Sequence, residues 1–597
     1  MCGIMGYVGK REAVPALLKG LKALEYRGYD SSGIAVHSGE DLSVVKRSGR
    51  IANLEKALAE HPLSGHCGIG HTRWATHGVA TDLNAHPFLS ECGKFAVVHN
   101  GIITNYRALA AFLERKGVTL RSDTDSEVVA HLIDCYYEGD VLSALCRAAR
   151  ELRGSFALGV ISIYEPEVLY GVRKDSPLIV GRGDGESALC SDFSGFFDIC
   201  DECCPLRNGE IVRVTPTGAR LFDFSGKERP ISFVKREREE IGDLEDGEDF
   251  MHREIAQTPL ALSAGCRAFP KEALAPFLHQ GFSEILVLGC GSAYNAGLIF
   301  KGVLRDFLGT FVRDEIASEF LARPGGAGKG TLVLAVSQSG ETADTLLAVR
   351  KAKRAGATVL SVCNVPASSL VRASDYALIT KCGRERAVAA TKSYVAQVHA
   401  LLMIALLYAE VTGKADPTAL AKLRAELASL PEKVTRVLQS EPLLARLAEE
   451  AKDAKAIFFL GRGQDYYAAR EGSLKLKEIT YLFSEAYPAG ELKHGTLALM
   501  EKGVFGVIVA TDLRYAEKYA STLAEITCRG ASAIVIATEK VAAELPAERR
   551  IILPNTDPLF APVLSAVAMQ EFAYFVAKKR GCDVDKPRNL AKSVTVE

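Results

Sequence analysis

The sequence predicts a multi-domain fold, in which an α+β domain is followed by two α/β domains with doubly wound parallel sheets. Two observations carry this prediction. Upstream of the charged stretch Lys235 to Asp249, short β-branched runs alternate with amphipathic helices. Downstream of it, a pattern of strand, glycine turn and helix recurs, and the segments Ile285 to Gly297 and Ile457 to Gly472 repeat it in related form.

The first domain is predicted element by element. A helix is expected from about Glu12 to Glu25, because leucines recur along one stripe of that segment. A second helix is expected to start at a capping box formed by Thr124 to Glu127. Strands are expected at the β-branched runs Phe95 to Val98 and Ala157 to Ile163. Together these elements indicate a mixed α+β domain.

In the second half, each repeat places a buried strand before a Gly-x-Gly turn that opens a helix, which indicates two related lobes. We expect them to join among helices between about residues 400 and 450. The charged stretch interrupts apolar periodicity and is typical of a solvated linker. The predicted segments are 2–234 for the first domain, 235–249 for the linker, 250–425 and 440–587 for the lobes, and 588–597 for a C-terminal tail.

Composition limits the class of protein. The 597 residues include 72 basic and 73 acidic side chains, a formal net charge of -1. Nucleic acids and anionic membranes select basic surfaces, so neither is an expected partner. No apolar run reaches the roughly 20 residues of a membrane span, and the N-terminus lacks the regions of a signal peptide. We therefore expect a cytoplasmic protein.

The fifteen cysteines are scattered and odd in number, so a disulfide framework is not expected. Cys190, Cys200, Cys203 and Cys204 form one local group with spacing compatible with a metal. Zinc is nevertheless not predicted, because a second Cys-x-x-Cys or a histidine pair is missing and Cys203 is adjacent to Cys204.

Cys2 directly follows the initiator Met1, so removal of one residue would leave a thiol and a free α-amine on the same residue. A thiol has a reference pKa of roughly 8.5 and an α-amine one of about 7.7 to 8, which makes the amine a plausible proton acceptor near neutral pH. A cysteine also occurs at this position by chance. Its interpretation as a nucleophile depends on the polar segments that follow.

Several of these segments suit the binding of a small amide: Arg27-Gly28, His71 to Gly78, His99-Asn100-Gly101 and Ser122 to Asp125. Each has an ordinary structural explanation, such as a hairpin turn at Asn100-Gly101 or a helix-start acid at Asp125. With Cys2, however, the motifs MCGI, LEYRGYDSSG, HTRWATHG, NAHP, HNGI and SDTDSEVVAHL resemble the N-terminal-nucleophile glutamine amidotransferases.

This resemblance implies a four-layer αββα glutaminase domain. Cys2, freed of Met1, would attack the glutamine side-chain amide with its α-amine as general base and release ammonia. Asn100 and the Gly101 amide would form the oxyanion hole. Arg73 would bind the glutamine α-carboxylate and Asp125 its α-ammonium. The other glutamine-binding positions implied are Trp74, Thr76, His77 and His86.

The first lobe carries a candidate phosphate site. The strand Thr331 to Val336 runs into the segment Ser337 to Thr342, SQSGET, and hydroxyls with backbone N–H groups at a helix N-terminus bind anions. Capping by Ser339 would explain that serine alone. The turn Gly289 to Ser292 supplies a second helix N-terminus, which favours phosphate. The second lobe has no counterpart, since its strand ends in Ala510-Thr511-Asp512, so one phosphate site per chain is expected.

The segments SQSGETADT, CNVPASSLVR, FLGRG, EGSLKLKEI, GELKHGTLAL and PRNLAKSVTVE resemble the sugar isomerase half of the glutamine:fructose-6-phosphate aminotransferase family. This implies two sugar isomerase (SIS) domains and conversion of fructose 6-phosphate and L-glutamine to glucosamine 6-phosphate and L-glutamate. That reaction is the first step of UDP-N-acetylglucosamine biosynthesis, and the family needs no metal or other cofactor. Trp74 matches the gate of the family's ammonia channel.

The resemblance also implies catalytic roles. Lys592, otherwise a solvated tail lysine, would form a Schiff base with the open-chain ketose. Glu478 would move the proton between C1 and C2. Lys475 would stabilise the enolamine charge, the alternative being an i,i+3 surface ion pair with Glu478. His494 would open the sugar ring of the neighbouring subunit, which implies a homodimer. The implied sugar-phosphate contacts are Ser292, Ser337, Gln338, Ser339, Thr342, Val388 and Ala591.

Several positions depart from the family pattern. Ala293 and Ala390 stand where the family has serines, Ser292 stands where it has threonine, and Thr496 replaces the proline that follows His494-Gly495. The segment Cys200 to Cys204 is also atypical of the family. A neutral hydrogen bond contributes roughly 0.5 to 1.5 kcal/mol, so we expect weaker substrate binding with the reaction unchanged. The loop that carries His494 is expected to be looser.

Two other functions are compatible with parts of the sequence. A phosphoribosyl-pyrophosphate amidotransferase would need an acidic, hydroxyl-rich pyrophosphate loop and magnesium, and neither SQSGET nor PRNLAKSVTVE fits it. A sugar-phosphate sensor would bind its ligand without catalysis. The joint presence of Lys475, Glu478, His494 and Lys592 disfavours the sensor.

Overall fold

The computed structural model describes residues 2–74, 78–196, 199–235 and 248–595. By their contacts the residues form two compact units, Met1–Gly242 with Ser593–Glu597 and Asp243–Lys592. Residues 236–247 of the predicted linker lie outside the described residues. We call the two bodies unit 1 and unit 2.

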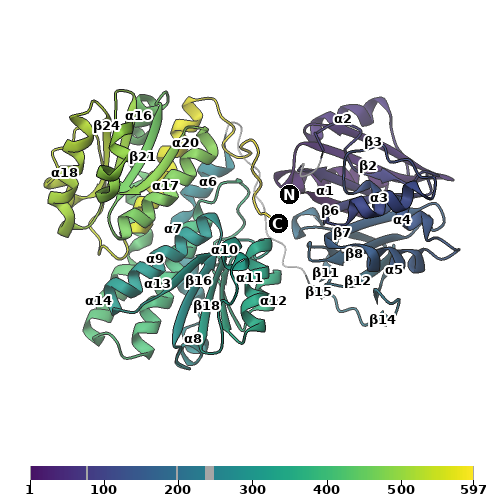
Figure 1. Cartoon of the computed structure of the whole chain (residues 1–597), viewed down its shortest axis with the longest axis horizontal. Coiled ribbons are helices and arrows are strands. Elements are labelled where there is room, and N and C mark those ends of the chain that lie inside the picture. Colours follow the sequence, from purple (N-terminus) through teal and green to yellow (C-terminus); the bar gives the residue numbers. More distant parts are fainter. Residues whose placement is uncertain (1, 75–77, 197–198, 236–247, 596–597) are drawn as a thin grey trace. The chain divides into compact units, whose positions relative to one another are not determined.

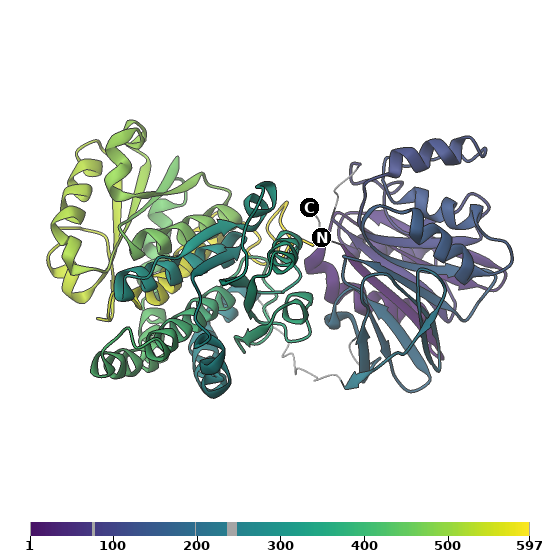
Figure 2. The same cartoon turned by 60° about the horizontal axis from the view of Figure 1, so that its bottom comes forward.

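Unit 1 consists of two stacked antiparallel sheets with helices on both outer faces (Figure 1, Figure 2). The eight-stranded sheet has the order β15-β11-β9-β10-β1-β4-β2-β3, and the seven-stranded sheet has the order β14-β13-β12-β8-β7-β6-β5. Helices α1 and α2 pack on the first sheet and α4 packs on the second. The four-layer αββα prediction is therefore confirmed.

The strands of the larger sheet are β1 Gly3–Gly9, β2 Ser31–Ser38, β3 Asp41–Ser48, β4 Cys67–Arg73, β9 Ile179–Arg182, β10 Glu186–Cys190, β11 Glu202–Pro205 and β15 Val234–Lys235. Those of the smaller sheet are β5 Phe88–Leu89, β6 Phe95–Ile103, β7 Gly154–Ser162, β8 Leu169–Lys174, β12 Glu210–Thr215, β13 Gly218–Asp223 and β14 Glu228–Arg229. The helices are α1 Ala13–Leu24, α2 Ile51–Glu60, α3 Tyr106–Glu114, α4 Glu127–Cys135 and α5 Val141–Glu151, with short 3-10 turns η1 Glu25–Arg27 and η2 Phe193–Phe196.

Strand β1, which follows Cys2, lies at the centre of the unit and is buried on both faces. Its residues alternate with the period of two that a strand imposes. Ile4 and Val8 join the apolar layer between the two sheets. Met5 and Tyr7 point to the other face and pack beneath α1. The start of the chain is thus held between two apolar layers, which fixes the position of Cys2.

One alternative and one local prediction in unit 1 are wrong. The alternative explanation of Asn100 and Gly101 as a hairpin turn fails, because β6 continues through them to Ile103 and pairs with β7 along its full length. Helix α4 starts at Glu127 and not at Thr124. The Glu127 carboxylate accepts hydrogen bonds from the backbone amides of Arg121 and Ser122, so it does not close a capping box.

Unit 2 contains two five-stranded parallel sheets of identical topology. Their strand orders are β17-β16-β18-β19-β20 and β22-β21-β23-β24-β25, so the first strand of each repeat lies between its second and third. This is a doubly wound order, and it places binding sites beyond the carboxyl ends of the strands. The strands are β16 Glu284–Gly289, β17 Arg313–Ile316, β18 Thr331–Ser337, β19 Thr358–Cys363, β20 Tyr376–Ile379, β21 Ala456–Gly461, β22 Ser484–Pro488, β23 Val504–Ala510, β24 Ser532–Thr538 and β25 Arg550–Leu553.

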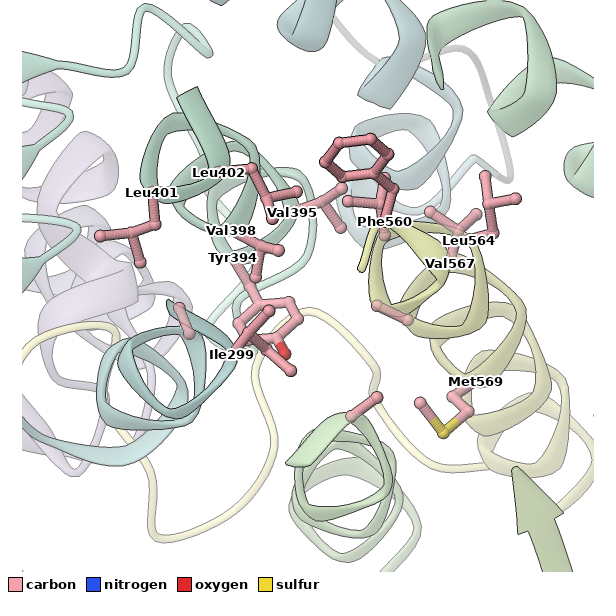
Figure 3. Close-up of a cluster of buried hydrophobic side chains, with 14 of the residues drawn as sticks. Ile299, Tyr394, Val395, Val398, Leu401, Leu402, Phe560, Leu564, Val567 and Met569 are labelled. Atoms are coloured by element: carbon pink, nitrogen blue, oxygen red, sulfur yellow. The ribbon is translucent and has the colours of Figure 1, made fainter. Parts of the chain in front are cut away.

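The inner faces of both sheets share one apolar core, which is built mainly from α9, α13, α17 and α20. Figure 3 shows part of it, where Val395 and Leu402 of α13 lie near Phe560. Helix α13 is long and apolar enough to cross a membrane, but 89% of that window is buried inside the protein. The repeat predicted from the glycine turns is therefore confirmed as two lobes with a common core.

The helices before and within the first lobe are α6 Phe250–Ala256, α7 Thr258–Ala268, α8 Lys271–Leu278, α9 Gly291–Leu308, α10 Ala317–Ala322, α11 Ala343–Arg354 and α12 Ser369–Ala373. Those that join and complete the second lobe are α13 Lys392–Val411, α14 Pro417–Ala428, α15 Leu430–Leu438, α16 Glu441–Ala451, α17 Gln464–Thr480, α18 Ala516–Thr527, α19 Glu539–Ala543 and α20 Ala561–Lys579. Three 3-10 turns are also present: η3 Ala489–His494, η4 Thr496–Leu499 and η5 Leu513–Tyr515.

Candidate active sites

Cys2 lies just before β1, close to the end of β4. The Trp74 backbone amide donates a hydrogen bond to the Cys2 Sγ atom at 3.3 Å, and the thiol lies 3.6 Å from the Trp74 carbonyl oxygen. Burial raises the pKa of the thiol, while the Trp74 amide and the charges of Arg73 and Arg27 act in the opposite direction. The thiol is thus fixed in one position beside positive charge.

Asn100 reaches Cys2 from the other sheet, and Gly101 follows it on β6. The Asn100 Nδ2 atom donates to the Cys2 carbonyl oxygen at 3.0 Å. Gly101 has a φ of +132°, and a Cβ atom there would stand 2.0 Å from the Ser155 carbonyl oxygen. Glycine is therefore required by both the backbone conformation and the neighbouring strand. Arg27, which the sequence places in a segment suited to binding a small amide, donates from Nε to the same Cys2 carbonyl at 3.3 Å.

Arg73 and Asp125, predicted to bind the two ends of glutamine, are both buried. The Arg73 guanidinium donates to the carbonyl oxygens of Gly78 at 3.1 Å and Val79 at 3.4 Å. The Asp125 carboxylate accepts from the Ile103 amide at 2.7 Å. Trp74 is half-buried. The predicted contacts Thr76 and His77 lie outside the described residues.

Three buried histidines lie behind Asn100: His71, His86 and His99. The ring centroids of His71 and His86 are 4.1 Å apart. Burial lowers the pKa of His71 to about 3 and that of His86 well below its usual value, so both rings are neutral near pH 7. A neutral imidazole can donate a hydrogen bond but carries no charge, which suits His86 to a polar contact rather than an ion pair.

In unit 2, one cavity of about 160 Å³ collects nearly all predicted sugar-site residues. It lies beyond the carboxyl ends of β16 and β18, at the N-terminal ends of α9 and α11, as expected for a parallel sheet. The lining residues are Cys290, Ser292, Ala293, Val336, Ser337, Gln338, Ser339, Thr342, Val388, Ala390, Gln397, Lys475, Glu478, Leu590, Ala591 and Lys592.

The segment Ser337 to Thr342 forms a loop of inward hydroxyls at this cavity. The Ser337 Oγ atom lies 3.2 Å from the Thr342 Oγ1 atom and accepts from the Gly340 amide at 3.1 Å. The Ser339 hydroxyl accepts from the Glu341 amide at 3.2 Å and does not cap α11. Hydroxyls and amides around the N-terminus of a twelve-residue helix form a suitable anion site.

Lys475 and Glu478 form an ion pair that is not on the surface, so the alternative of a surface pair is wrong. The Lys475 side chain is 1% exposed and also lies 3.5 Å from a Glu471 carboxylate oxygen. Burial alone lowers the pKa of Lys475, but the two carboxylates outweigh it, and the pKa is raised. Ser292 donates to Glu471 at 2.7 Å, which links the predicted phosphate shell to this ion pair.

Lys592 is not a solvated tail lysine. Its side chain is 4% exposed and ion-pairs with Glu385, which is completely buried. Glu385 also accepts from the backbone amides of Thr391 and Ser393 at 2.9 and 3.0 Å. Burial raises the pKa of this carboxyl, but Lys592 and the hydrogen bonds from Ser393 hold it at about 2. Sequence reasoning missed Glu385, because nothing in GRERAVAATK distinguishes a ligand of the tail lysine from a surface charge.

The remaining predicted positions are placed as follows. His494 ends η3, is exposed, and is not among the residues that line the cavity. Ala293 and Ala390 both line the cavity, so the two missing hydroxyls face the predicted substrate. None of the fifteen cysteines, all of which the structure describes, forms a disulfide bond. None of the described His, Cys, Asp and Glu residues form a cluster of three suited to a metal.

Known proteins resemble both halves. Residues 71–196 match the glutamine amidotransferase domain family, and residues 282–407 and 451–577 each match the SIS domain family. The glutamine--fructose-6-phosphate aminotransferases [isomerizing] of Clostridium tetani and Thermus thermophilus are each 43% identical, over 613 and 614 residues, and each alignment covers 100% of both chains. The solved C-terminal domain of the Francisella tularensis glucosamine-fructose-6-phosphate aminotransferase is 35% identical with a TM-score of 0.56, and covers 58% of this chain and 100% of that one.

The relatives from Clostridium tetani and Thermus thermophilus align over the whole of this chain and therefore over both units. The predicted family, fold and enzymatic nature are confirmed. The chain belongs to the glutamine–fructose-6-phosphate aminotransferase (isomerizing) family of enzymes.

Proposed function

We propose that this enzyme transfers the amide nitrogen of L-glutamine to fructose 6-phosphate and isomerises the product to glucosamine 6-phosphate, with L-glutamate as the second product. One observation carries the proposal. A cavity of unit 2 combines a hydroxyl-lined anion site with Lys592 and with the ion pair of Glu478 and the buried Lys475. A sugar phosphate requires the first feature, and amination with isomerisation of a ketose requires the others.

At the glutamine site, the Cys2 thiol attacks the side-chain amide after removal of Met1, and the α-amine accepts the thiol proton. Asn100 Nδ2 and the Gly101 amide donate to the oxygen of the tetrahedral intermediate, whose collapse to a thioester releases ammonia. Hydrolysis of the thioester then gives L-glutamate. Loss of one oxyanion donor typically raises such a barrier by about 3 kcal/mol.

Arg73 binds the α-carboxylate of glutamine and Asp125 binds its α-ammonium, and these two contacts select glutamine. Trp74, Thr76, His77 and His86 complete the glutamine site, and Trp74 also gates the ammonia passage.

At the sugar site, Ser337, Gln338, Ser339 and Thr342 bind the phosphate, with Ser292 beside them. Val388 and Ala591 contact the sugar through their backbones. The Lys592 amine forms a Schiff base with the C2 carbonyl of the open-chain ketose and loses water. Ammonia then displaces the lysine, which returns to its free amine.

Glu478 next moves one proton from C1 to C2 in the aminated sugar. The C1 hydroxyl gives up its proton and the imine nitrogen gains one, so the C2 imine becomes an amine and C1 becomes the aldehyde of the aldose. The enolamine intermediate carries developing negative charge on oxygen. Lys475 stabilises this charge, because its pKa is raised and it stays protonated near pH 7. The Glu471 carboxylate holds Lys475 on its other side at 3.5 Å.

We further propose that the enzyme is cytoplasmic and acts as a homodimer. His494 is exposed in η3 and absent from the cavity lining of its own chain, which supports its use by a partner subunit. Neither a cofactor nor a nucleic acid is needed for the reaction. The domain limits that accompany this proposal are those given by the sequence, 2–234, 250–425 and 440–587, with 588–597 as the catalytic tail.

The proposal is tested by incubating the purified enzyme with L-glutamine and fructose 6-phosphate and measuring amino sugar. Formation of glucosamine 6-phosphate is expected, and its absence would contradict the proposal. Borohydride reduction with fructose 6-phosphate, followed by peptide mapping, should trap an adduct at Lys592. Binding of fructose 6-phosphate without an adduct would instead support a sensor.

A further inference from the structure

His71 connects the two sheets of unit 1 at the glutamine site. It lies on β4 of the larger sheet, directly opposite Ile4 of β1, and is completely buried. Its Nε2 atom lies 2.9 Å from the Asn100 Oδ1 atom and 2.9 Å from the His99 carbonyl oxygen, both on β6 of the smaller sheet. The sheet that carries Cys2 thus contacts the proposed oxyanion donor through one side chain.

The two contacts determine the tautomer of His71. Both neighbours are hydrogen-bond acceptors, so Nε2 must carry the proton. The Nδ1 atom has no hydrogen-bond partner among the described residues. A neutral ring protonated only at Nε2 satisfies this arrangement, and its burial keeps it neutral.

The same contacts determine the orientation of the Asn100 amide. Its Oδ1 atom faces His71, and its Nδ2 atom therefore faces the Cys2 carbonyl oxygen at 3.0 Å. Rotation of the Asn100 amide by 180° would place its N–H group against the Nε2–H group of His71, so that two donors face each other. It would also place its oxygen against the Cys2 carbonyl oxygen, so that two acceptors face each other. Each buried mismatch leaves polar groups without a partner, so the rotated amide is disfavoured twice.

We propose that His71 is a positioning residue for glutamine hydrolysis, which fixes the Asn100 amide so that its N–H group faces the oxyanion. This inference rests on the proposed function, in which Asn100 is an oxyanion donor. His71 itself touches neither glutamine nor Cys2. It acts by holding the amide in place before the substrate arrives, so that the donor needs no reorientation when charge develops.

Two substitutions separate this role from packing. His71→Gln retains an N–H donor at a reach similar to Nε2, whereas His71→Met has similar bulk and no donor. For glutamine hydrolysis, kcat of H71M should fall about 10- to 100-fold, because an oxyanion donor is displaced while the substrate contacts remain. KM for glutamine should change by less than about threefold. H71Q should recover kcat to within about threefold of wild type.

A second measurement uses glutamate γ-semialdehyde, whose aldehyde adds to the Cys2 thiol and places an oxyanion in the hole. Its affinity should fall in H71M in parallel with kcat, while the affinity for L-glutamate stays unchanged. If H71M does not fold, H71N replaces it, because the shorter amide keeps polarity without reaching Asn100. Synthesis from fructose 6-phosphate and ammonium, which does not use this site, reports whether unit 2 is intact.

The proposal is overturned if the donor-free variant keeps kcat within about threefold of wild type, or if H71Q and H71M lose kcat equally with a raised KM. Cys2→Ala distinguishes these results from failure of the proposed function. If C2A still hydrolyses glutamine, the proposed nucleophile is wrong. If C2A is inactive and H71M is fully active, only the positioning role is wrong.

Discussion

Lys592 and Glu385 form a buried ion pair although they are 207 residues apart in the sequence. Glu385 lies in the loop before α13, and Lys592 belongs to the C-terminal segment that lines the sugar cavity. Hydrogen bonds from Thr391 and Ser393 fix the carboxylate. The proposed Schiff-base lysine is therefore held at the cavity by a partner that is itself rigid.

Removing this partner should destabilise unit 2. In Glu385→Gln, the Lys592 ammonium stays buried without a counter-charge, and breaking such a pair costs about 3 to 5 kcal/mol. We expect a lower free energy of unfolding for the unit 2 transition in urea. The double variant E385Q/K592M removes both charges and should recover part of the loss. Additive losses in the double variant would show that the two side chains are not coupled.

Gly101 should tolerate no side chain. In Gly101→Ala, the added Cβ atom would meet the Ser155 carbonyl at 2.0 Å, so β6 and β7 must separate at the oxyanion hole. Glutamine hydrolysis should fall at least about 100-fold in kcat. Gly93→Ala is the matched control, since Gly93 also has a positive φ but no atom within 4 Å of its Cβ position. G93A should keep full activity, and equal losses in both variants would contradict the assignment.

Arg73→Lys should impair glutamine binding selectively. Lysine is a point charge and cannot bind a carboxylate in a bidentate manner. We expect KM for glutamine to rise about 10- to 100-fold, as two charge-assisted hydrogen bonds are weakened. Synthesis with ammonium should be unaffected. The half-exposed Arg47, which lies 3.8 Å from Asp82, provides the control R47K. An unchanged KM in R73K would rule out the carboxylate contact.

Glu127 should make unit 1 sensitive to acid. Burial raises the pKa of its carboxyl, but hydrogen bonds from His131, Arg121 and Ser122 hold it at about 2, below the ordinary 4.5. A lowered folded-state pKa gives stability that is present above pH 4.5 and is lost as the pH falls toward 2. The urea midpoint of unit 1 in Glu127→Gln should therefore lie below wild type at pH 7 and approach it at low pH. Glu114 is exposed, so the urea midpoint of Glu114→Gln should not approach that of wild type as the pH falls. A difference in midpoint between E127Q and wild type that stays constant with pH would contradict the assignment.

Much of the fold follows from local sequence signals. The β-branched runs Phe95 to Val98 and Ala157 to Ile163 predict β6 and β7, and the glycine turns before α9 and α17 predict the repeated lobes. The start of α4 was wrong because the Glu127 side chain turns to the Arg121 and Ser122 amides, a preference that depends on how the preceding loop folds. Short-range signals do not contain that information.

The residues of the candidate sites likewise include some that the sequence predicts and some that it does not. Cys2, Asn100 and the loop from Ser337 to Thr342 stand out as motifs. The roles of Glu385 and His71 could not be predicted, because each depends on a contact between segments far apart in the sequence. Burial is also invisible in the sequence. Lys475 and Lys592 look like surface lysines there, but their side chains are buried in the structure.

The central claim, that nitrogen released at Cys2 is installed on a sugar held by Lys592, is tested most directly with an isotope. The enzyme is supplied with fructose 6-phosphate, L-glutamine labelled with ¹⁵N at the side-chain amide, and an excess of unlabelled ammonium. We expect glucosamine 6-phosphate that carries the ¹⁵N label, measured by mass spectrometry. Product in which the label is diluted to the level of free ammonium, or no amino sugar at all, would contradict it.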